Sequence, residues 1–355
     1  MNILFVIDGL HGGGAARVTT VVANELVKKG YNIAIATNLS TRSCVYQLDH
    51  NIKVFNIYGE KKYFSFINLL DHILRLRKVV NEFKPDVIIG EQENGIIYAK
   101  FATLCLGIPI IGHRHNTFKI LGLSKLQRLI YNSVSTTVLL HKTDVAFVEK
   151  KITKAQAIYN PCSFDIKYVP QKEKKKIIAV VGSTKRYLDK GFDLAIDVWH
   201  TLAHQYPDWH LYIIGGGSET NEEILKQKIV DYGLVDRVTL TGFVNDIENR
   251  LHEASIFLLP SRVEGFPMVI NEAISQGCAC ASFSLQGVMK ELYSNAAVLI
   301  SEDGDLDSFC YNVGRMIESF DTRETLAENA QSELKKYQPE VIVNDWIDLI
   351  DKIKR

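Results

Sequence analysis

Residues 255–277 read SIFLLPSRVEGFPMVINEAISQG, and this stretch decides the fold class. Its apolar start predicts a buried strand that ends at Pro260, while Pro267 suits the first turn of a helix and Gly277 its end. A strand, a short loop and a helix in this order are typical of a parallel sheet. The sequence therefore predicts an α/β protein whose ligands bind beyond the carboxyl ends of the strands.

The same alternation of strands and helices runs through the rest of the chain. Strand-like runs include ILFVI at 3–7, DVIIG at 86–90, LYIIGGG at 211–217 and CACASF at 278–283. The polar, proline-flanked stretch at 161–176 interrupts the pattern and predicts a linker. We expect two Rossmann-like domains facing each other across a cleft, at 1–165 and 175–337, with a C-terminal helix at 338–355 packing on either of them.

The composition excludes several classes of protein. The chain has 355 residues, of which 46% are hydrophobic and 23% charged, as in a globular protein with more than one domain. Its six cysteines lack metal-type spacing, and its first residues do not resemble an export leader, so a cytoplasmic location is expected. No apolar window reaches the roughly 18 residues of a membrane-spanning helix, so any membrane contact is expected to be peripheral.

Charge is divided unequally along the chain. Residues 1–168 hold 21 Lys and Arg against 12 Asp and Glu, and the remainder is acidic to the same extent. A basic half favours an anionic partner, although two packed domains of opposite charge would give the same pattern. No feature of the sequence indicates a nucleic-acid partner.

Glu264 and Glu272 stand on either side of the start of the helix expected after Pro260. We expect the N–H groups of residues 266–269 to face an anion, because the first amides of a helix have no partner within it. Carboxylates accept hydrogen bonds from the neighbouring hydroxyl groups of a ribose or a hexose. The stretch therefore indicates a sugar-nucleotide site, whereas either glutamate alone would be an ordinary surface residue.

The loop after the first strand is rich in glycine. It reads DGLHGGGAAR at 8–17, and a helix is expected to begin near Val18. Glycines allow the backbone to approach a ligand closely, and a helix N-terminus attracts phosphate. A simple tight turn is an equal alternative, because the spacing is neither G-x-G-x-x-G nor that of a P-loop.

Two further loops carry polar clusters at strand ends. His113, Arg114, His115 and Asn116 follow PII and are expected to be exposed, either as ligand contacts or as structural residues. Metal binding is not expected there, because no matching acidic or histidine cluster is evident. The loop after IIAVVG, at 182–191, contains three cations that suit the charge of a diphosphate leaving group or are simply solvated.

The string EGFPMVINE resembles the signature of retaining glycosyltransferases of family 4, which have the GT-B fold, and the resemblance covers nearly the whole chain. It includes PIIGHRHN, KGFD at 190–193, IIGGGSE and VTLTGFVNDI. The resemblance implies catalytic roles for Glu264, His115 and Lys190. It implies donor-binding roles for Gly13, Gly14, Lys185, Arg186, Phe243, Val244, Gly265, Phe266, Pro267, Met268, Val269 and Glu272.

The same resemblance implies a mechanism in which the departing phosphate accepts the proton of the attacking hydroxyl, without a protein base, cofactor or metal. Two positions depart from the family pattern. Ala16 stands where a glutamate usually precedes Arg17, and Ser183 stands where an arginine usually follows Gly182. Lys185 or Arg186 is expected to replace that arginine.

We therefore expect transfer of a hexose or N-acetylhexosamine from a nucleotide sugar, UDP favoured over GDP, to a saccharide acceptor in cell-surface polysaccharide biosynthesis. A lipid-linked acceptor is favoured, because the basic and aromatic residues at 61–66 precede an amphipathic segment at 67–80 that suits the inner face of an anionic membrane. That segment is equally well explained as a helix whose apolar face packs in the core and whose charged face is exposed to solvent. The alternatives are an inactive nucleotide-sugar-binding protein and another GT-B enzyme such as an epimerase.

Overall fold

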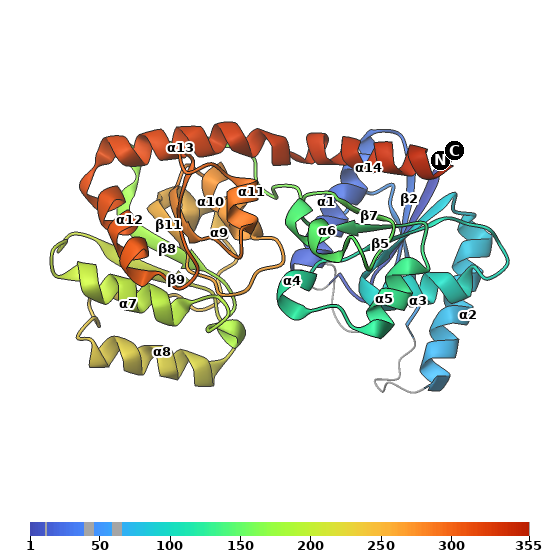
Figure 1. Ribbon diagram of the computed structural model, residues 1–355, viewed down its shortest axis with the longest axis horizontal. Helices are drawn as coiled ribbons and strands as arrows, with labels where there is room; N and C mark the ends of the chain where they lie inside the picture. Colours follow the sequence, from blue (N-terminus) through green and yellow to red (C-terminus); the bar gives the residue numbers. More distant parts are fainter. Residues whose placement is uncertain (11–12, 39–45, 59–65, 355) are drawn as a thin grey trace. The chain divides into compact units, whose positions relative to one another are not determined.

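The computed structural model describes residues 1–10, 13–38, 46–58 and 66–354. The chain divides into two compact units. The N-terminal unit comprises residues 1–163 and 337–355, and the C-terminal unit comprises residues 164–336. Each unit is one parallel sheet with helices packed on it, which confirms two Rossmann-like domains (Figure 1).

The N-terminal unit contains a seven-stranded parallel sheet in the order β3-β2-β1-β4-β5-β6-β7. Its strands are β1 Asn2–Val6, β2 Asn32–Thr37, β3 Lys53–Asn56, β4 Val87–Glu91, β5 Ile110–His113, β6 Thr136–Leu139 and β7 Ala155–Ala157. Strand order reverses beside β1, which pairs with both β2 and β4. Ligands of such sheets bind at the carboxyl ends of the strands near this reversal.

The helices of this unit are α1 Gly14–Lys28, α2 Phe66–Phe83, α3 Gln92–Ala102, α4 Phe118–Leu121, α5 Lys125–Asn132, α6 Lys142–Val148 and α14 Pro339–Lys354. Helix α1 begins at Gly14, so the predicted start near Val18 is wrong. Gly13 adopts φ 92° as the N-cap, and the two alanines that follow are strong helix formers. Helix α14 packs against α1 and buries Trp346.

The C-terminal unit contains a six-stranded parallel sheet in the order β10-β9-β8-β11-β12-β13. Its strands are β8 Lys175–Val181, β9 His210–Ile214, β10 Val238–Leu240, β11 Ala254–Leu259, β12 Ala279–Phe283 and β13 Val298–Ser301. Strand order reverses at β8, which pairs with β9 and β11. The sequence prediction of these strands is confirmed. Cys278 and Cys280 are buried, as expected for small core residues.

The helices of the C-terminal unit cover this sheet and share one core with it. They are α7 Phe192–Ala203, α8 Glu219–Asp231, α9 Ile247–Glu253, α10 Met268–Ser275, α11 Val288–Leu292, α12 Leu306–Glu318 and α13 Phe320–Leu334. Short 3-10 turns occupy η1 Gln171–Glu173, η2 Thr184–Arg186 and η3 Lys335–Tyr337. Trp199 of α7 is fully buried, and Phe283 packs on Phe309 with ring centroids 4.6 Å apart.

Candidate active site

Glu264 and Lys190 form an ion pair at the carboxyl ends of β8 and β11. Lys190 Nζ donates to Glu264 Oε1 at 2.8 Å and to Oε2 at 3.0 Å. The hydroxyl of Ser261 donates to the same Oε1 at 2.8 Å. Glu264 is buried, so the ammonium compensates a carboxylate that would otherwise be costly to remove from water. The structure thus brings together two residues that the sequence singled out separately.

Close packing of two loops creates this pair. Gly191 adopts φ +67°, and a Cβ there would lie 1.9 Å from the carbonyl oxygen of Pro260. Arg262 ties the same loops together, because its amide donates to Asp189 O at 2.8 Å. Its guanidinium binds both carboxylate oxygens of Asp193, at 2.8 and 2.7 Å. Such bidentate pairing fixes direction as well as distance, so Arg262 orients the loop that carries Lys190.

Helix α10 begins directly after this loop. Glu272 is buried within it, one turn from its start, as the sequence predicted. The prediction that the amides of residues 266–269 all face an anion is wrong for Met268, whose amide donates to Phe266 O at 2.8 Å. Gly265 precedes the N-cap Pro267, and Val269 is the second residue of α10.

The cations of the loop after β8 have different environments. Arg186 Nε donates to Asp189 Oδ2 at 2.8 Å, so this guanidinium already has a carboxylate partner. In the described part of the chain, Lys185 has no ion-pair partner. Ser183 caps the turn η2 and its hydroxyl donates to Gly216 O at 3.2 Å. Arg186 is therefore engaged by a carboxylate of its own loop, whereas Lys185 is not.

The loops after β9 and β10 touch each other at the same end of the sheet. The amide of Gly215 donates to Gly242 O at 3.0 Å, and a Cβ on Gly216 would lie 3.0 Å from the amide nitrogen of Phe243. Phe243 is 80% exposed, and Val244 beside it is half-buried. An exposed aromatic ring at this position is a platform on which a planar base can stack.

In the N-terminal unit, the end of β1 leads into the glycine loop. His11 and Gly12 lie outside the described residues, whereas Gly13 and Gly14 form the start of α1. A Cβ on Gly13 would meet nothing within 4 Å, so this glycine serves backbone conformation and not close packing. Asp8 lies beside this loop and accepts hydrogen bonds from Tyr58 Oη at 2.5 Å and Asn94 Nδ2 at 2.9 Å.

His115 lies against a buried carboxylate that the sequence analysis missed. Glu91, the last residue of β4, is 1% exposed, and its Oε2 lies 2.5 Å from His115 Nε2 and 3.0 Å from His113 Nδ1. The hydroxyl of Thr19 donates to Oε1 at 3.1 Å. Glu91 and His113 end neighbouring parallel strands and are paired in register, a relationship that the sheet order decides and that the sequence pattern does not show.

Electrostatics within this cluster favour an ionised Glu91. Burial alone raises the pKa of Glu91, but the two imidazoles lower it to about 2. Burial and the neighbouring His115 lower the pKa of His113 below 6.5, and Glu91 acts in the opposite sense. The expectation that no acidic group matches the histidines is wrong, because Glu91, His113 and His115 together have the composition of a metal site.

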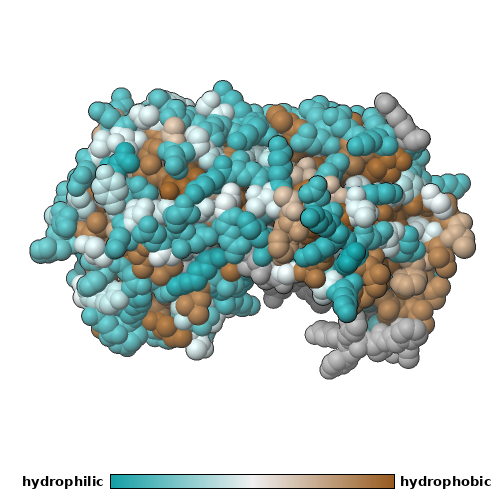
Figure 2. All heavy atoms as spheres, in the orientation of Figure 1, coloured by the Kyte–Doolittle hydropathy of each residue, from teal (hydrophilic) through white to brown (hydrophobic). Residues whose placement is uncertain are grey.

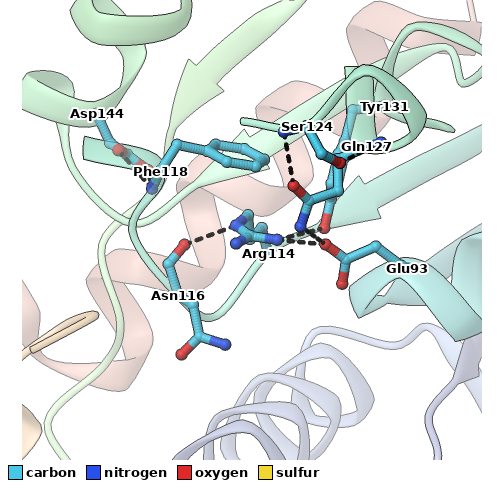
Figure 3. Close-up of polar contacts among 8 residues, drawn as sticks. All are labelled: Glu93, Arg114, Asn116, Phe118, Ser124, Gln127, Tyr131 and Asp144. Carbon is cyan, nitrogen blue, oxygen red and sulfur yellow. Dashed lines mark hydrogen bonds and ion pairs between the residues drawn. The ribbon is translucent and has the colours of Figure 1, made fainter. Parts of the chain in front are cut away.

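Arg114 and His113 are buried, so the prediction that residues 113–116 form an exposed loop is wrong for these two. Figure 3 shows Arg114 among its partners Glu93 and Asn116. Arg114 is 3% exposed and lies over the Phe118 ring, 3.9 Å from its centroid. Its Nε donates to Asn116 O at 2.9 Å, and its guanidinium pairs with Glu93.

Asp144, 1% exposed, accepts from the amide of Phe118 at 2.9 Å and holds the start of α4. This contact and those of Arg114 fix the loop that carries His115. Both depend on residues distant in sequence, because Asp144 lies on α6 and Glu93 on α3.

Comparisons with known proteins agree with this arrangement. The profile of "Glycosyltransferase Family 4" matches residues 12–202, and that of "Glycosyl transferases group 1" matches residues 164–333. An uncharacterized glycosyltransferase of Haemophilus influenzae is 28% identical over 96% of this chain and 97% of its own. A Campylobacter jejuni enzyme is 23% identical over 100% of this chain and 99% of its own. It is named as a GalNAc-α-(1→4)-GalNAc-α-(1→3)-diNAcBac-PP-undecaprenol α-1,4-N-acetyl-D-galactosaminyltransferase. The crystal structure of Anabaena HepE in complex with UDP and glucose has a TM-score of 0.78 at 18% identity, covering 99% of both chains.

Two Rossmann-like units give the chain the GT-B fold, and the two family profiles identify it as a glycosyltransferase. The chain belongs to Glycosyltransferase Family 4 and is a hexosyltransferase. Among the described residues, no helix is both long and apolar enough to cross a bilayer.

Proposed function

We propose that this enzyme transfers a hexose or N-acetylhexosamine from a UDP-sugar to a lipid-linked saccharide, with retention of anomeric configuration, in cell-surface polysaccharide synthesis. The observation that carries the proposal is the ion pair of Lys190 with the buried carboxylate of Glu264, beside the start of α10. A cation held there, next to a carboxylate able to bind sugar hydroxyls, suits a donor that is both anionic and polyhydroxylated.

In the proposed reaction, the acceptor hydroxyl oxygen bonds to the anomeric carbon while the bond from that carbon to the diphosphate oxygen breaks. The electron pair stays on the diphosphate, and a phosphate oxygen on the same face takes the acceptor proton. Lys190 and Lys185 stabilise the charge that develops on the leaving group. The reaction as proposed requires no cofactor, metal or protein base.

The donor is proposed to carry uridine. The Anabaena structure contains UDP, and this chain places the exposed ring of Phe243 where the loops after β9 and β10 meet. His115 is assigned to the transferred sugar, and Gly13 and Gly14 to the diphosphate and acceptor. These assignments are the ones that the resemblance to family 4 implies, and the position of each residue after the carboxyl end of a strand is compatible with them.

A lipid-linked acceptor is proposed because the Campylobacter relative is named for an undecaprenol-linked saccharide. In α2, Leu76 belongs to the core, but Leu74 is 62% exposed and Leu70 is also exposed. Nearby, Leu104 is exposed after α3, and Arg77 of α2 donates to its carbonyl oxygen at 3.1 Å. Figure 2 shows apolar side chains gathered over the end of the unit that carries α2. The predicted basic residues at 61–65 lie outside the described residues.

Such a surface suits peripheral contact with an anionic leaflet, where apolar side chains insert and cations pair with headgroups. Co-sedimentation with vesicles of anionic and of neutral lipid tests this, using Leu70→Ser with Leu74→Ser as the variant. Equal binding by the variant, or none by the wild-type protein, would reject the membrane contact.

A thermal-shift screen against UDP, GDP, ADP and NAD tests the donor site, because a ligand of the folded state raises the melting temperature. We expect UDP to stabilise the wild-type protein and Glu272→Gln to weaken the shift. Glu340→Gln, on the exposed face of α14, is the matched control. A response to NAD alone, or to no nucleotide, would reject the proposal, and a larger response to GDP would reject uridine.

Product analysis tests turnover and retention. We expect the hydrolysis of UDP-N-acetylgalactosamine, UDP-galactose or UDP-glucose to release the α-anomer first, as read by proton NMR. Initial release of the β-anomer would exclude retention. Saturable binding of the UDP-sugar without turnover in the presence of lipid-linked acceptors would reject the proposed acceptor class.

A further inference from the structure

Glu91 receives every polar contact of a small buried cluster. Its Oε1 accepts from Thr19 Oγ1 at 3.1 Å, and its Oε2 faces His115 Nε2 at 2.5 Å and His113 Nδ1 at 3.0 Å. His113 packs between His115, with ring centroids 4.1 Å apart, and the edge of Trp346, at 5.0 Å. The imidazoles are thus held in place by stacking as well as by the carboxylate.

The chemistry of these groups determines where the protons lie. An ionised carboxylate only accepts hydrogen bonds, so both facing nitrogens, His113 Nδ1 and His115 Nε2, must donate. In a neutral imidazole the opposite nitrogen then bears a lone pair. His115 Nδ1 and His113 Nε2 are buried and have no hydrogen-bond partner among the residues that the structure describes. A buried acceptor without a partner is costly unless something occupies it during function.

We propose that Glu91 is a positioning residue that holds His115 as the Nε2–H tautomer, so that Nδ1 is a preformed acceptor for a hydroxyl group of the transferred sugar. This inference rests on the proposed function, because it deepens the role assigned there to His115. A preformed acceptor selects a hydroxyl donor over a carbonyl or ether oxygen at the same place. His113 donates to the second lone pair of Glu91 Oε2, so that both lone pairs of this oxygen are occupied.

A bound metal is the competing explanation, since all three side chains can be ligands and their ligand atoms lie within 4.8 Å of one another. The distances within the cluster favour hydrogen bonds over metal coordination. Glu91 Oε2 already lies at hydrogen-bond distance from both nitrogens, whereas a metal would have to replace both of these contacts. Elemental analysis of the purified protein, before and after incubation with zinc, decides this point. Stoichiometric metal would overturn the proposal.

Nitrogen-15 NMR of histidine-labelled full-length protein reads the tautomer directly. The His115 and His113 signals are assigned by their loss in His115→Asn and His113→Asn. We expect His115 to carry its proton on Nε2 at neutral pH in the free wild-type protein. A proton on Nδ1, or on both nitrogens, would overturn the proposal. This measurement needs no substrate and no Glu91 variant, so it stands even if the donor assignment fails or Glu91→Gln does not fold.

Two matched comparisons test the positioning role. Glu91→Gln should give mixed His115 tautomers and lower kcat/KM for the UDP-sugar by about 10- to 100-fold, as for other orienting partners of histidine. Glu93→Gln perturbs the same loop through Arg114 without touching His115, and should leave the tautomer unchanged. An unchanged tautomer in Glu91→Gln would overturn the role of Glu91.

The contact between His115 and the sugar is tested by comparing the NMR spectra of the protein with a UDP-sugar and with UDP alone. Binding of a UDP-sugar should shift the His115 Nδ1 resonance, whereas UDP alone should not. Equal shifts with both ligands would overturn the hydroxyl contact while leaving nucleotide binding intact. Failure of both ligands to bind would instead reject the proposed function, and the tautomer of the free protein would still be known.

Discussion

Lys190 Nζ lies 2.8 and 3.0 Å from the two carboxylate oxygens of Glu264, although 74 residues separate them along the chain. Both carboxylate oxygens are therefore engaged by one ammonium, and Ser261 adds a third contact. In the proposed function, a diphosphate entering this site would compete with Glu264 for the cation. Redistribution of Lys190 towards the leaving group would free the carboxylate for sugar hydroxyls.

Loss of Lys190 should impair both catalysis and folding. Lys190→Ala leaves Glu264 buried without its partner, so we expect a loss of about 1–3 kcal/mol in the free energy of unfolding. Removal of a charge-stabilising donor typically lowers kcat by about 10²- to 10³-fold. Chemical denaturation and donor-hydrolysis assays measure the two effects. Lys190→Ala with Glu264→Gln should regain stability but not activity; recovery of both would contradict a catalytic role.

Neighbouring cations should behave differently. Lys185→Ala should weaken UDP binding by roughly 1 kcal/mol or more, because a charge-assisted hydrogen bond is lost. Arg186→Ala should change it little, since Arg186 is already paired with Asp189. Isothermal titration of both variants with UDP gives the comparison. A larger loss in Arg186→Ala would show that the pair breaks on binding and reverses our assignment.

Two glycines with nearly equal backbone angles provide a matched test of loop packing. Gly191 and Gly233 have φ +67° and +65°, but only Gly191 abuts another backbone, at Pro260 O. Gly233→Ala should cost about 1–2 kcal/mol in unfolding free energy from the left-handed conformation alone. Gly191→Ala should cost more and should also lower activity, because the Lys190 loop must move. Equal costs in urea denaturation would argue against that displacement.

The stability of the folded state should fall as pH falls, because folding lowers the pKa of two groups. The pKa of His113 is lowered in the folded state, so the unfolded chain binds more protons below about 6.5 and folding weakens there. The pKa of Glu91 is also lowered, so its contribution is present above the unfolded value of 4.5 and is lost as pH falls towards 2.

Melting temperatures between pH 8 and 4 measure the first of these effects. His113→Asn should flatten the decline between pH 7 and 5, whereas His204→Asn, on the exposed end of α7, should not. A decline of unchanged slope in His113→Asn would assign the pH dependence to other groups.

Arg114 should act through loop geometry and not through substrate. Arg114→Lys keeps a positive charge but loses planar stacking on Phe118 and the bond from Nε to Asn116 O. We expect about 1–3 kcal/mol of destabilisation, with a lower kcat because His115 is less well placed. Denaturation and kinetics on the same preparation check this. Normal stability with low activity would indicate direct substrate contact instead.

Local sequence was sufficient for most of the strands and for the helices that follow them, but not for β3, β6 and β7 or for the role of Glu91 at the end of β4. Alternation of apolar runs and the positions of Pro267 and Gly277 depend on short-range physics that any segment carries with it. The start of α1 was misplaced because a run of glycines hides the N-cap, which Gly13 provides only in the folded backbone. The resemblance of the chain to family 4 was confirmed by the family match over residues 12–202, and EGFPMVINE itself lies within the match to the group 1 glycosyl transferases at 164–333.

Only the tertiary structure decided which of these residues meet. The pairing of Lys190 with Glu264, the enclosure of His115 by Glu91 and the burial of Arg114 all join side chains from different elements. Such contacts depend on strand register and on the packing of loops against each other. Periodicity within a segment carries no information about either. The sequence by itself therefore determined where chemistry is located along the chain, and packing determined its partners and charge states.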